Sequence, residues 1–490
     1  MEQVAANSRF GRSNQSSVVA RTVTAAARAH ASQRAITADF GVWTYSDLLD
    51  EVERVASVLE TLHARQVAVL AHEPASTLVW LLAALGSGTP ISVCAPTSHA
   101  KHSEIADLVV GAMPYSDSVF PTLRPRIALP PGSVCLSTAG TSGEPKRIVH
   151  DDASLAHAIY QLQRLRAEML PSTPIEDDVA SQLQATASGP NLGLTYLGGM
   201  PIWTVAGLTI AFQALCCGDH IVLHNGFSLE RLANDIDAHC VTNLSLAPFM
   251  AQQLVRLLRR ESRSTGDSLL HVGIGGGLAP AAIAADLEDT LAAAVTVGYG
   301  ATEAGGPISI SRLNDSREVR HGTVGRALPG VEVALDEDIV RVRSRSLALG
   351  YVRSNGIERF TDADGWWKTG DRGYSGTDGN IVITGRADDL IIRGGKNIDP
   401  VQLERALERH PMVEIAAVLS RPGRVGSESD IYALLVCSDQ PTRGSIIEVC
   451  RANDQTVPQR LLRVPTLPLT DDGVPRRRML DELIAHAEPI

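Results

Sequence analysis

The sequence lacks the features that mark membrane, secreted and nucleic-acid-binding proteins. None of its apolar runs is long enough to cross a bilayer, and the N-terminal stretch MEQVAANSRFGRSNQSS is polar, without the apolar segment of a signal peptide. The formal net charge of −11 repels nucleic acid and anionic membranes in bulk. We therefore expect a cytoplasmic protein that has no nucleic-acid partner and inserts into no membrane.

Disulfide frameworks, repeats and low-complexity segments are missing as well. The seven cysteines include no CxxC pair and predict buried, reduced thiols. Apolar residues make up 44% of the chain and charged residues 20%, which is typical of a globular protein. A chain of 490 residues is too long for one core, so it should form two or more domains.

Strands and helices alternate through the N-terminal part. Residues 65–71 and 90–96 are typical of buried strands on either side of a helix over 76–88, which predicts a βαβ unit. The pattern recurs over residues 219–260, where Ser228 is placed to cap a helix.

Two further strands, in LLHVGIGGGLAP and AVTVGYGATEAGG, each run into a glycine turn, so ligand groups should gather where these strands end. After Gly306 the chain alternates around DED and TDG turns, as β-hairpins do. From residue 401 a helix and two strands begin a smaller α+β unit. The predicted fold class is α/β: a large N-terminal domain of βα-layered sheets with a β-rich subdomain, and a small α+β C-terminal lid domain.

The stretch Leu136–His150, LSTAGTSGEPKRIVH, is rich in Gly, Ser and Thr and has little side chain to bury. Such a run exposes backbone N–H groups and hydroxyls, which are the groups that hold a phosphate. The spacing from Gly140 through Gly143 to Lys146 excludes a Walker loop. Taken alone, such a stretch is more often a surface turn than a nucleotide site.

Four more motifs follow it in order: YGATE at 299–303, GWWKTGDRG at 365–373, GRADDLI at 385–391 and GGKNIDPVQLE at 394–404. Together with TAGTSGEPK at 138–146, the set resembles the adenylate-forming superfamily, which includes acyl-CoA synthetases, aryl-CoA ligases, firefly luciferase and the adenylation domains of peptide synthetases. The resemblance covers nearly the whole chain.

This resemblance implies an AMP-forming acid–thiol ligase that uses ATP and Mg²⁺. Such an enzyme activates a small-molecule carboxylic acid and transfers the acyl group to CoA or to the phosphopantetheine of an acyl carrier protein. It also implies a core over residues 1–387 that binds ATP and the acid, and a mobile lid over 388–490 with its hinge near Asp388. The loop that holds Lys396 would face the site during thioester formation.

Joining a carboxylate to the α-phosphate brings two anions together, so the site must neutralise charge. By resemblance, Glu303 binds Mg²⁺, and an oxygen ligand suits that hard cation. Asp371 would accept hydrogen bonds from both ribose hydroxyls, and Tyr299 would offer a flat face to adenine. Lys146 either contacts phosphate or stays solvated, Glu303 could merely begin a helix, and Arg386 could form only a surface ion pair.

The residues assigned by resemblance fall into three groups. The predicted catalytic residues are Lys146, Thr302, Glu303, Arg386 and Lys396. The predicted nucleotide-binding residues are Thr138, Thr141, Ser142, Gly143, Gly276, Gly277, Tyr299, Gly300, Asp371 and Arg386. The predicted acid-binding residues are Trp203, Thr204, Gly207 and Gly275.

Three positions depart from the family pattern. Arg147 stands where glycine is usual and should add bulk and charge beside the phosphate loop, and Thr204 replaces a histidine. Val474 occupies the place of the lysine that bridges carboxylate and α-phosphate. Losing one such donor typically costs about 3 to 4 kcal/mol. A weak ligase, a substitute arginine from 476–478, a half-reaction enzyme and a non-catalytic binding protein therefore all stay open.

The acid is less determined than the reaction. Adenylation domains for amino acids hold the ammonium with an aspartate in an FDxS-like segment, and this chain has PIWTVAGL there. The region around it resembles aryl-CoA and succinylbenzoate-CoA ligases. An aromatic or short acyl carboxylate is therefore favoured over a free amino acid.

Overall fold

The structure is a computed structural model that describes residues 17–96, 106, 108–111, 118–121, 127–138, 146–169, 178–189, 191–226, 228–393, 396–421, 429–468 and 479–490. The chain divides into two compact units. The first consists of residues 1–334, 341–368 and 375–381, and the second of 335–340, 369–374 and 382–490. The predicted domain boundary and hinge near Asp388 stay predictions.

The first unit contains an eight-stranded sheet with the spatial order β19-β18-β8-β7-β4-β3-β5-β6 within the described residues. Its strands are β3 (Val67–Leu70), β4 (Ile91–Cys94), β5 (Leu108–Gly111), β6 (Ser118–Pro121), β7 (Val134–Thr138), β8 (Lys146–His150), β18 (Gly350–Arg353) and β19 (Gly356–Glu358). Strands β3 and β4 are parallel and are joined through α3 (Pro74–Ser87), which confirms the predicted βαβ unit.

A second sheet of the same unit has nine described strands in the order β15-β14-β13-β12-β11-β9-β10-β1-β2. They are β1 (Arg34–Ala38), β2 (Gly41–Thr44), β9 (Thr195–Leu197), β10 (His220–Val222), β11 (Asn243–Leu246), β12 (His271–Ile274), β13 (Ala294–Ala301), β14 (Gly306–Ile310) and β15 (Arg326–Ala327). The run from β13 to β1 is parallel, so its strands end at one edge of the sheet. The two predicted glycine turns therefore follow neighbouring strands.

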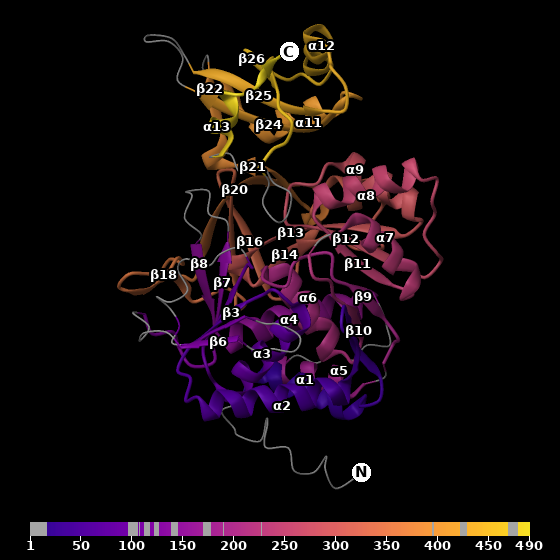
Figure 1. Ribbon diagram of the computed structural model, residues 1–490. Coiled ribbons are helices and arrows are strands. Elements are labelled where there is room, and N and C mark those ends of the chain that lie inside the picture. Colours follow the sequence, from indigo (N-terminus) through magenta and orange to yellow (C-terminus); the bar gives the residue numbers. More distant parts are fainter. Residues whose placement is uncertain are drawn as a thin grey trace. The chain divides into compact units, whose positions relative to one another are not determined.

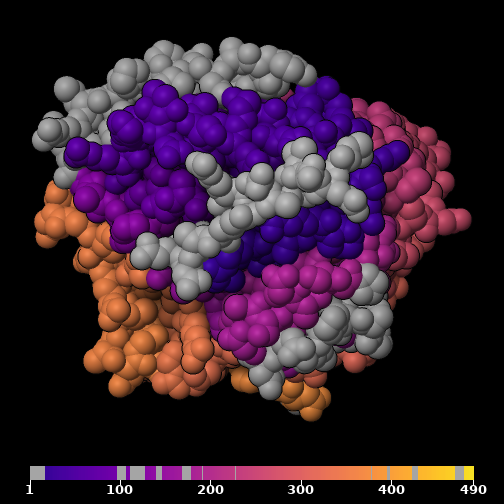
Figure 2. Space-filling model, turned by 90° about the horizontal axis from the view of Figure 1, so that it is seen from below, coloured from indigo at the N-terminus to yellow at the C-terminus, as the bar shows by residue number. Residues whose placement is uncertain are grey.

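Helices cover these sheets and build their core. They are α1 (Val18–Ala29), α2 (Tyr45–Thr61), α4 (Asp152–Met169), α5 (Val179–Ser188), α6 (Val205–Cys216), α7 (Leu229–Ala238), α8 (Pro248–Arg260), α9 (Ala281–Leu291) and α10 (Arg317–Gly322). One core cluster joins residues of α1 to α6 with strands of both sheets, including the fully buried Ile36, Trp80 and Phe212. Helix α1 packs on α5, and their indigo and magenta residues lie side by side in Figure 2. As predicted, Ser228 caps α7, its side chain accepting from the Arg231 N–H.

A four-stranded sheet of order β16-β17-β20-β21 follows the large sheets in the chain. Its strands are β16 (Val331–Asp336), β17 (Ile339–Ser344), β20 (Trp367–Ser375) and β21 (Ile381–Arg386). The DED turn links β16 to β17, and the TDG turn precedes β21, which confirms the predicted β-rich segment after Gly306.

The C-terminal part of the second unit is a small α+β structure, coloured orange to yellow in Figure 1. Its elements are β22 (Ile391–Arg393), β23 (Lys396–Ile398), β24 (Val413–Arg421), β25 (Asp430–Cys437), β26 (Arg460–Arg463), β27 (Glu488–Pro489), α11 (Pro400–Glu408), α12 (Arg443–Ala452) and α13 (Leu480–Ile484). Leu403 and Leu407 of α11 join the core formed with β24 and β25. The α/β fold class with a smaller α+β part is thus confirmed. No helix in the described ranges has both the length and the apolar content that a membrane span needs.

Candidate active site

The hairpin of β7 and β8 holds both ends of the predicted phosphate loop. Thr138 lies directly opposite Lys146 in the antiparallel pair, so these two residues stand at the mouth of the loop. Thr141, Ser142 and Gly143 lie outside the described residues. The register thus brings together the loop's flanking threonine and lysine, and the phosphate contacts stay a prediction.

One face of β8 carries the chemistry of this region. Alternation along a strand places Lys146, Ile148 and His150 on the same face. Tyr351 of β18 pairs with Ile148, so it shares that face. Residues on the other face, including Val149, join a separate apolar cluster.

Arg147 is expected beside the phosphate loop, but strand alternation turns its side chain away from the face of Lys146. Its charge acts instead on buried thiols of β4 and β7. Burial raises the pKa of Cys135 to about 11, and that of Cys94 well above its usual value, while the guanidinium opposes both shifts. The arginine that stands in place of the usual glycine therefore acts on buried thiols of the sheet.

Glu303 lies in a short 3-10 helix, η2 (Thr302–Ala304), directly after β13. Its Oε1 accepts a hydrogen bond of 2.8 Å from the Tyr351 hydroxyl. The Lys146 Nζ stands 5.4 Å from the centroid of the Tyr351 ring, a cation–π contact. The structure therefore brings Lys146 and Glu303 together through Tyr351, a residue that sequence reasoning missed.

His150 fixes the main chain of the same turn. It is fully buried, and its Nε2 lies 2.7 Å from the Thr302 carbonyl oxygen. Burial lowers the pKa of His150 from 6.5 to about 4, so the ring is neutral at pH 7. A carbonyl can only accept, hence Nε2 carries the proton. Sequence reasoning gave His150 no role, although it shares the strand face of Lys146.

Glycines let the Tyr299–Gly306 hairpin close tightly. A Cβ on Gly300 would lie 2.4 Å from the Gly306 carbonyl oxygen, which no side chain tolerates. Gly305 has φ +76°, and its Cβ would lie 3.0 Å from the Ser346 oxygen. Close packing against Gly306 therefore explains why position 300 is glycine. Tyr299 stands opposite Ser309 in the β13–β14 pair.

The predicted acid-binding residues gather around the start of α6. Thr204 is the helix N-cap: its Oγ1 accepts from the Gly207 N–H at 3.2 Å and donates to the Pro201 oxygen at 2.7 Å. A Cβ on Gly207 would lie 2.2 Å from the same Pro201 oxygen. Trp203 packs half-buried against the main core. The local fold thus explains Thr204 and Gly207 without a substrate, and their binding role stays a prediction.

The glycine turn after β12 lies near this helix start. The Gly275 N–H donates to the Leu246 oxygen at 3.1 Å, and Gly276 adopts φ +79°. The Met200 Cε would lie 3.3 Å from a Cβ on Gly276, so Met200 reaches the turn from the loop before α6. Gly275, Gly276 and Gly277 therefore adjoin the segment that carries Trp203 and Thr204.

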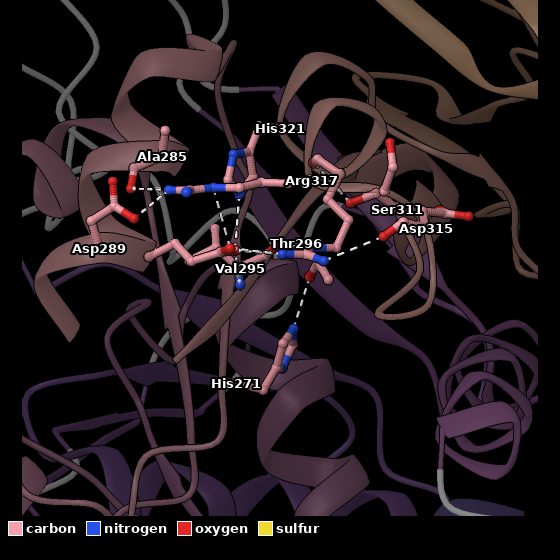
Figure 3. A network of polar contacts seen from close by, with 12 residues as sticks. His271, Ala285, Asp289, Val295, Thr296, Ser311, Asp315, Arg317 and His321 are labelled. Atoms are coloured by element: carbon pink, nitrogen blue, oxygen red, sulfur yellow. Dashed lines mark hydrogen bonds and ion pairs between the residues drawn. The ribbon is translucent and has the colours of Figure 1, made fainter. Parts of the chain in front are cut away.

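Strand β13 is held in place by a polar network shown in Figure 3. Glu288 of α9 accepts from the Val295 N–H at 3.0 Å and from Arg320 of α10 at 2.7 Å. Burial raises the pKa of Glu288, but hydrogen bonds from Arg320, the Val295 N–H and His321 outweigh it and lower the pKa to about 2. His271 Nε2 lies 2.8 Å from Thr296 Oγ1 on the neighbouring strand. Strand β13, which leads into the turn with Glu303, is therefore anchored on two sides.

The second unit holds the other predicted nucleotide contacts. Asp371 lies in β20, and its Oδ1 is 3.6 Å from Nη1 of Arg386 at the end of β21. The Asp371 N–H donates to Thr369 Oγ1 at 3.0 Å. The two predicted residues are thus brought together as an ion pair, with 15% of the Asp371 side chain and 38% of the Arg386 side chain exposed.

Two predicted features lie at or beyond the edge of the described structure. Lys396 begins β23, and its side chain is outside the description. Val474 and the three arginines at 476–478 lie outside the described residues. The roles of these positions stay predictions.

The metal expected from the resemblance can be tested against the residues present. No three His, Cys, Asp or Glu side chains within the described ranges gather as a metal cluster. Mg²⁺ usually keeps several waters and is held by one or two carboxylates plus substrate phosphates. Glu303, an oxygen donor close to the phosphate-loop lysine, fits that mode of binding.

Comparison with known proteins supports the resemblance of the sequence motifs to the adenylate-forming superfamily. Residues 133–351 match the family described as AMP-binding enzyme. The matched segment covers less than half of the chain.

Its similarity to individual relatives extends over most of the chain. It is 25% identical over 470 residues to a 2-succinylbenzoate–CoA ligase of Listeria monocytogenes, covering 90% of this chain and 94% of that one. An O-succinylbenzoate–CoA synthetase of Bacillus subtilis, solved with ATP and a magnesium ion, has a TM-score of 0.73 at 21% identity and covers 94% and 99% of the two chains. An anthranilate–CoA ligase solved with anthranoyl-AMP has a TM-score of 0.76 at 18% identity, covering 96% and 98%. These two structures show the fold alone.

Proposed function

We propose that this protein is an ATP-dependent acid–CoA ligase. In the first step a carboxylate oxygen bonds to the α-phosphorus of ATP and pyrophosphate leaves. In the second step a thiol bonds to the acyl carbon and AMP leaves. Among all observations, the convergence of Lys146, Tyr351 and Glu303 beside the mouth of the phosphate loop supports this proposal best.

Each residue of the first unit has a task that its contacts support. Glu303 would hold Mg²⁺ with its carboxylate, and the cation would offset the negative charge of the phosphates. Lys146 brings a second positive charge to the end of the phosphate loop. Thr302 presents its hydroxyl to phosphate, while its carbonyl is occupied by His150. Thr138 and the loop from Thr141 to Gly143 would bind the triphosphate with N–H and O–H donors.

The remaining proposed roles concern residues of the second unit and the adenine site of the first unit. Asp371, which lies beside Arg386, would accept hydrogen bonds from the two ribose hydroxyls. Arg386 would extend toward the nucleotide, and Lys396 would serve thioester formation after rotation about the hinge near Asp388. Tyr299, Gly276 and Gly277 would line the adenine site in the first unit, with Gly300 allowing the close backbone approach.

The substrate we propose is an aromatic or short acyl carboxylic acid, held near Trp203, Thr204, Gly207 and Gly275. The absence of an FDxS-like aspartate supports it, because an ammonium would lack its counterion. The names of the relatives, which act on 2-succinylbenzoate and anthranilate, support it too. CoA is the acceptor we favour, since those relatives are CoA ligases; a carrier-protein phosphopantetheine has the same reactive thiol.

One observation favours a second candidate function. Val474 carries no charge at the position of the bridging lysine, so a binding protein or a half-reaction enzyme is the alternative. The two functions differ in turnover and not in nucleotide binding.

Pyrophosphate release over a panel of aryl and short acyl acids, including 2-succinylbenzoate and anthranilate, separates these functions. The ligase releases pyrophosphate only with its acid, and it forms a thioester when CoA or a phosphopantetheinylated carrier protein is supplied in parallel reactions. ATP binding without pyrophosphate release from any acid, with either thiol present, would instead establish the binding protein.

A further inference from the structure

We propose that Tyr351 is a positioning residue, which aims the Glu303 carboxylate at a divalent cation and links it to Lys146. This inference rests on the proposed function, because the cation would arrive with ATP. It assigns a task to a residue that none of the sequence motifs contains.

The position of Tyr351 follows from strand register. Its partner Ile148 stands in β8 between Lys146 and His150, which are two residues to either side on the same face. Long side chains reach such diagonal neighbours across an antiparallel pair. The Tyr351 ring therefore meets Lys146, with Nζ 5.4 Å from the ring centroid, while its hydroxyl extends to Glu303.

The main chain at Glu303 is fixed independently of Tyr351. The Glu303 carbonyl accepts from the Ala348 N–H at 2.8 Å, and the Thr302 carbonyl accepts from His150 at 2.7 Å. These contacts set where the carboxylate begins and leave its side-chain torsions open. Among the described residues, the Tyr351 hydroxyl, at 2.8 Å from Oε1, is the donor that selects one orientation of the carboxylate.

The kind of donor matters for cation binding. A phenol hydroxyl is neutral, so it brings no positive charge that would compete with a bound cation, whereas a guanidinium would. A carboxylate offers about four acceptor sites, so one hydrogen bond leaves the others for a cation. Partners of this kind, which orient a metal ligand, typically contribute about ten- to hundredfold in metal affinity.

Neighbouring side chains hold the Tyr351 ring in place. Arg353 stands 5.3 Å from the same ring centroid, and its guanidinium donates to Glu358 at 2.6 Å. Phe360 packs on the ring with centroids 5.2 Å apart. The ring is therefore constrained by neighbours that do not depend on the hydroxyl, and removing the hydroxyl alone should leave the ring in place.

The test uses the full-length chain and Mn²⁺ as the probe, with bound Mn²⁺ measured by electron paramagnetic resonance at saturating ATP. Tyr351→Phe keeps the ring and its contact with Lys146 and should weaken Mn²⁺ binding about ten- to hundredfold. ATP binding in EDTA, measured by calorimetry, should not change. In a Glu303→Gln background, adding Tyr351→Phe should cause no further loss.

A matched control is Tyr160→Phe, which removes a hydroxyl that contacts Arg164 at 3.3 Å in the same unit. It should leave Mn²⁺ binding unchanged. Steady-state pyrophosphate release gives a further readout: for Tyr351→Phe the half-saturating Mg²⁺ concentration rises, and kcat returns toward wild type when Mg²⁺ saturates. A purely structural defect would not respond to the metal concentration.

Two results would overturn the inference while the proposed function stands: Mn²⁺ affinity in Tyr351→Phe equal to wild type, or an equal loss of metal-free ATP binding. If the wild-type chain binds no ATP with or without Mn²⁺, the inference falls together with the proposed function.

Discussion

Two carboxylates assigned to the nucleotide are held in opposite ways. Glu303 in the first unit meets a neutral hydroxyl at 2.8 Å, and its main chain is fixed by backbone and histidine contacts. Asp371 in the second unit stands 3.6 Å from a guanidinium. A neutral partner leaves a carboxylate free of a competing positive charge when it binds a cation, whereas a carboxylate beside a guanidinium can still accept hydrogen bonds from neutral hydroxyls. The partner of each carboxylate thus indicates what it binds.

The largest expected effect comes from neutralising the carboxylate of the first unit. Glu303→Gln should lower acid-dependent pyrophosphate release about a hundred- to thousandfold, because stabilisation of charge at the reacting phosphate is lost. Initial rates at saturating ATP measure it. The control is Glu358→Gln on the neighbouring strand β19, which pairs with Arg353 at the surface. Equal activity of the wild type and Glu303→Gln would remove Glu303 from the metal role.

The neutral state of His150 predicts a particular acid sensitivity. The folded-state pKa lies below the unfolded value, so this contribution to stability is present above pH 6.5 and is lost as pH falls toward 4. The linked loss is on the order of 3 kcal/mol. Urea unfolding of His150→Gln over this range should show a shallower pH dependence than the wild type.

The exposed His486→Gln serves as its control and should keep the wild-type slope. An identical slope in His150→Gln would mean that His150 is already charged in the folded protein, and the hydrogen bond to Thr302 would need another explanation.

In the second unit, Asp371→Ala should weaken ATP binding about ten- to hundredfold, since hydrogen bonds to a charged acceptor are lost. Calorimetry in the absence of metal isolates this effect from that of Glu303. Asp364→Ala, at an exposed turn, is the matched control. Weaker ATP binding of Asp371→Ala only in the presence of Mg²⁺ would contradict the assignment of Asp371 to the ribose and of Glu303 to the metal.

The smallest effect we expect is a gain. Val474→Lys would supply the missing cation and should raise the rate of pyrophosphate release about tenfold. Val474→Leu keeps the position apolar and should not change the rate. A rate for Val474→Lys at or below wild type would show that another group, such as one of the arginines at 476–478, already provides this charge.

The order of strands and helices could be predicted because the periodicity of apolar residues and helix capping depend on residues that are close in sequence. The βαβ unit from β3 to β4 and the Ser228 cap are examples. The Tyr351 contact could not, because Tyr351 lies 48 residues from Glu303 in sequence and meets it only through the register of β18 on β8. Asp371 and Arg386 likewise meet only because β20 and β21 are neighbours in one sheet.

Other local signals in the sequence indicate packing and capping roles for residues that the family pattern singles out. Strand alternation alone places Arg147 on the opposite face from Lys146 and His150 on the same face as Lys146. Thr204 followed three residues later by Gly207 is a helix start, and the cap accounts for both positions. A family pattern names residues by position, but only the local backbone tells which of them have side chains free for a ligand.

The contact between Gly385 and Asp399 has a consequence for motion. A Cβ on Gly385 would lie 2.5 Å from the Asp399 carboxylate, and Gly385 has φ +150°. The proposed hinge at Asp388 lies between these two residues in the chain, so rotation there would pull the Asp399 side chain away from Gly385. A methyl group at position 385 would clash with the Asp399 carboxylate in the arrangement described here. Gly385→Ala should therefore shift the balance between the two half-reactions, which separate assays of pyrophosphate release and thioester formation would detect.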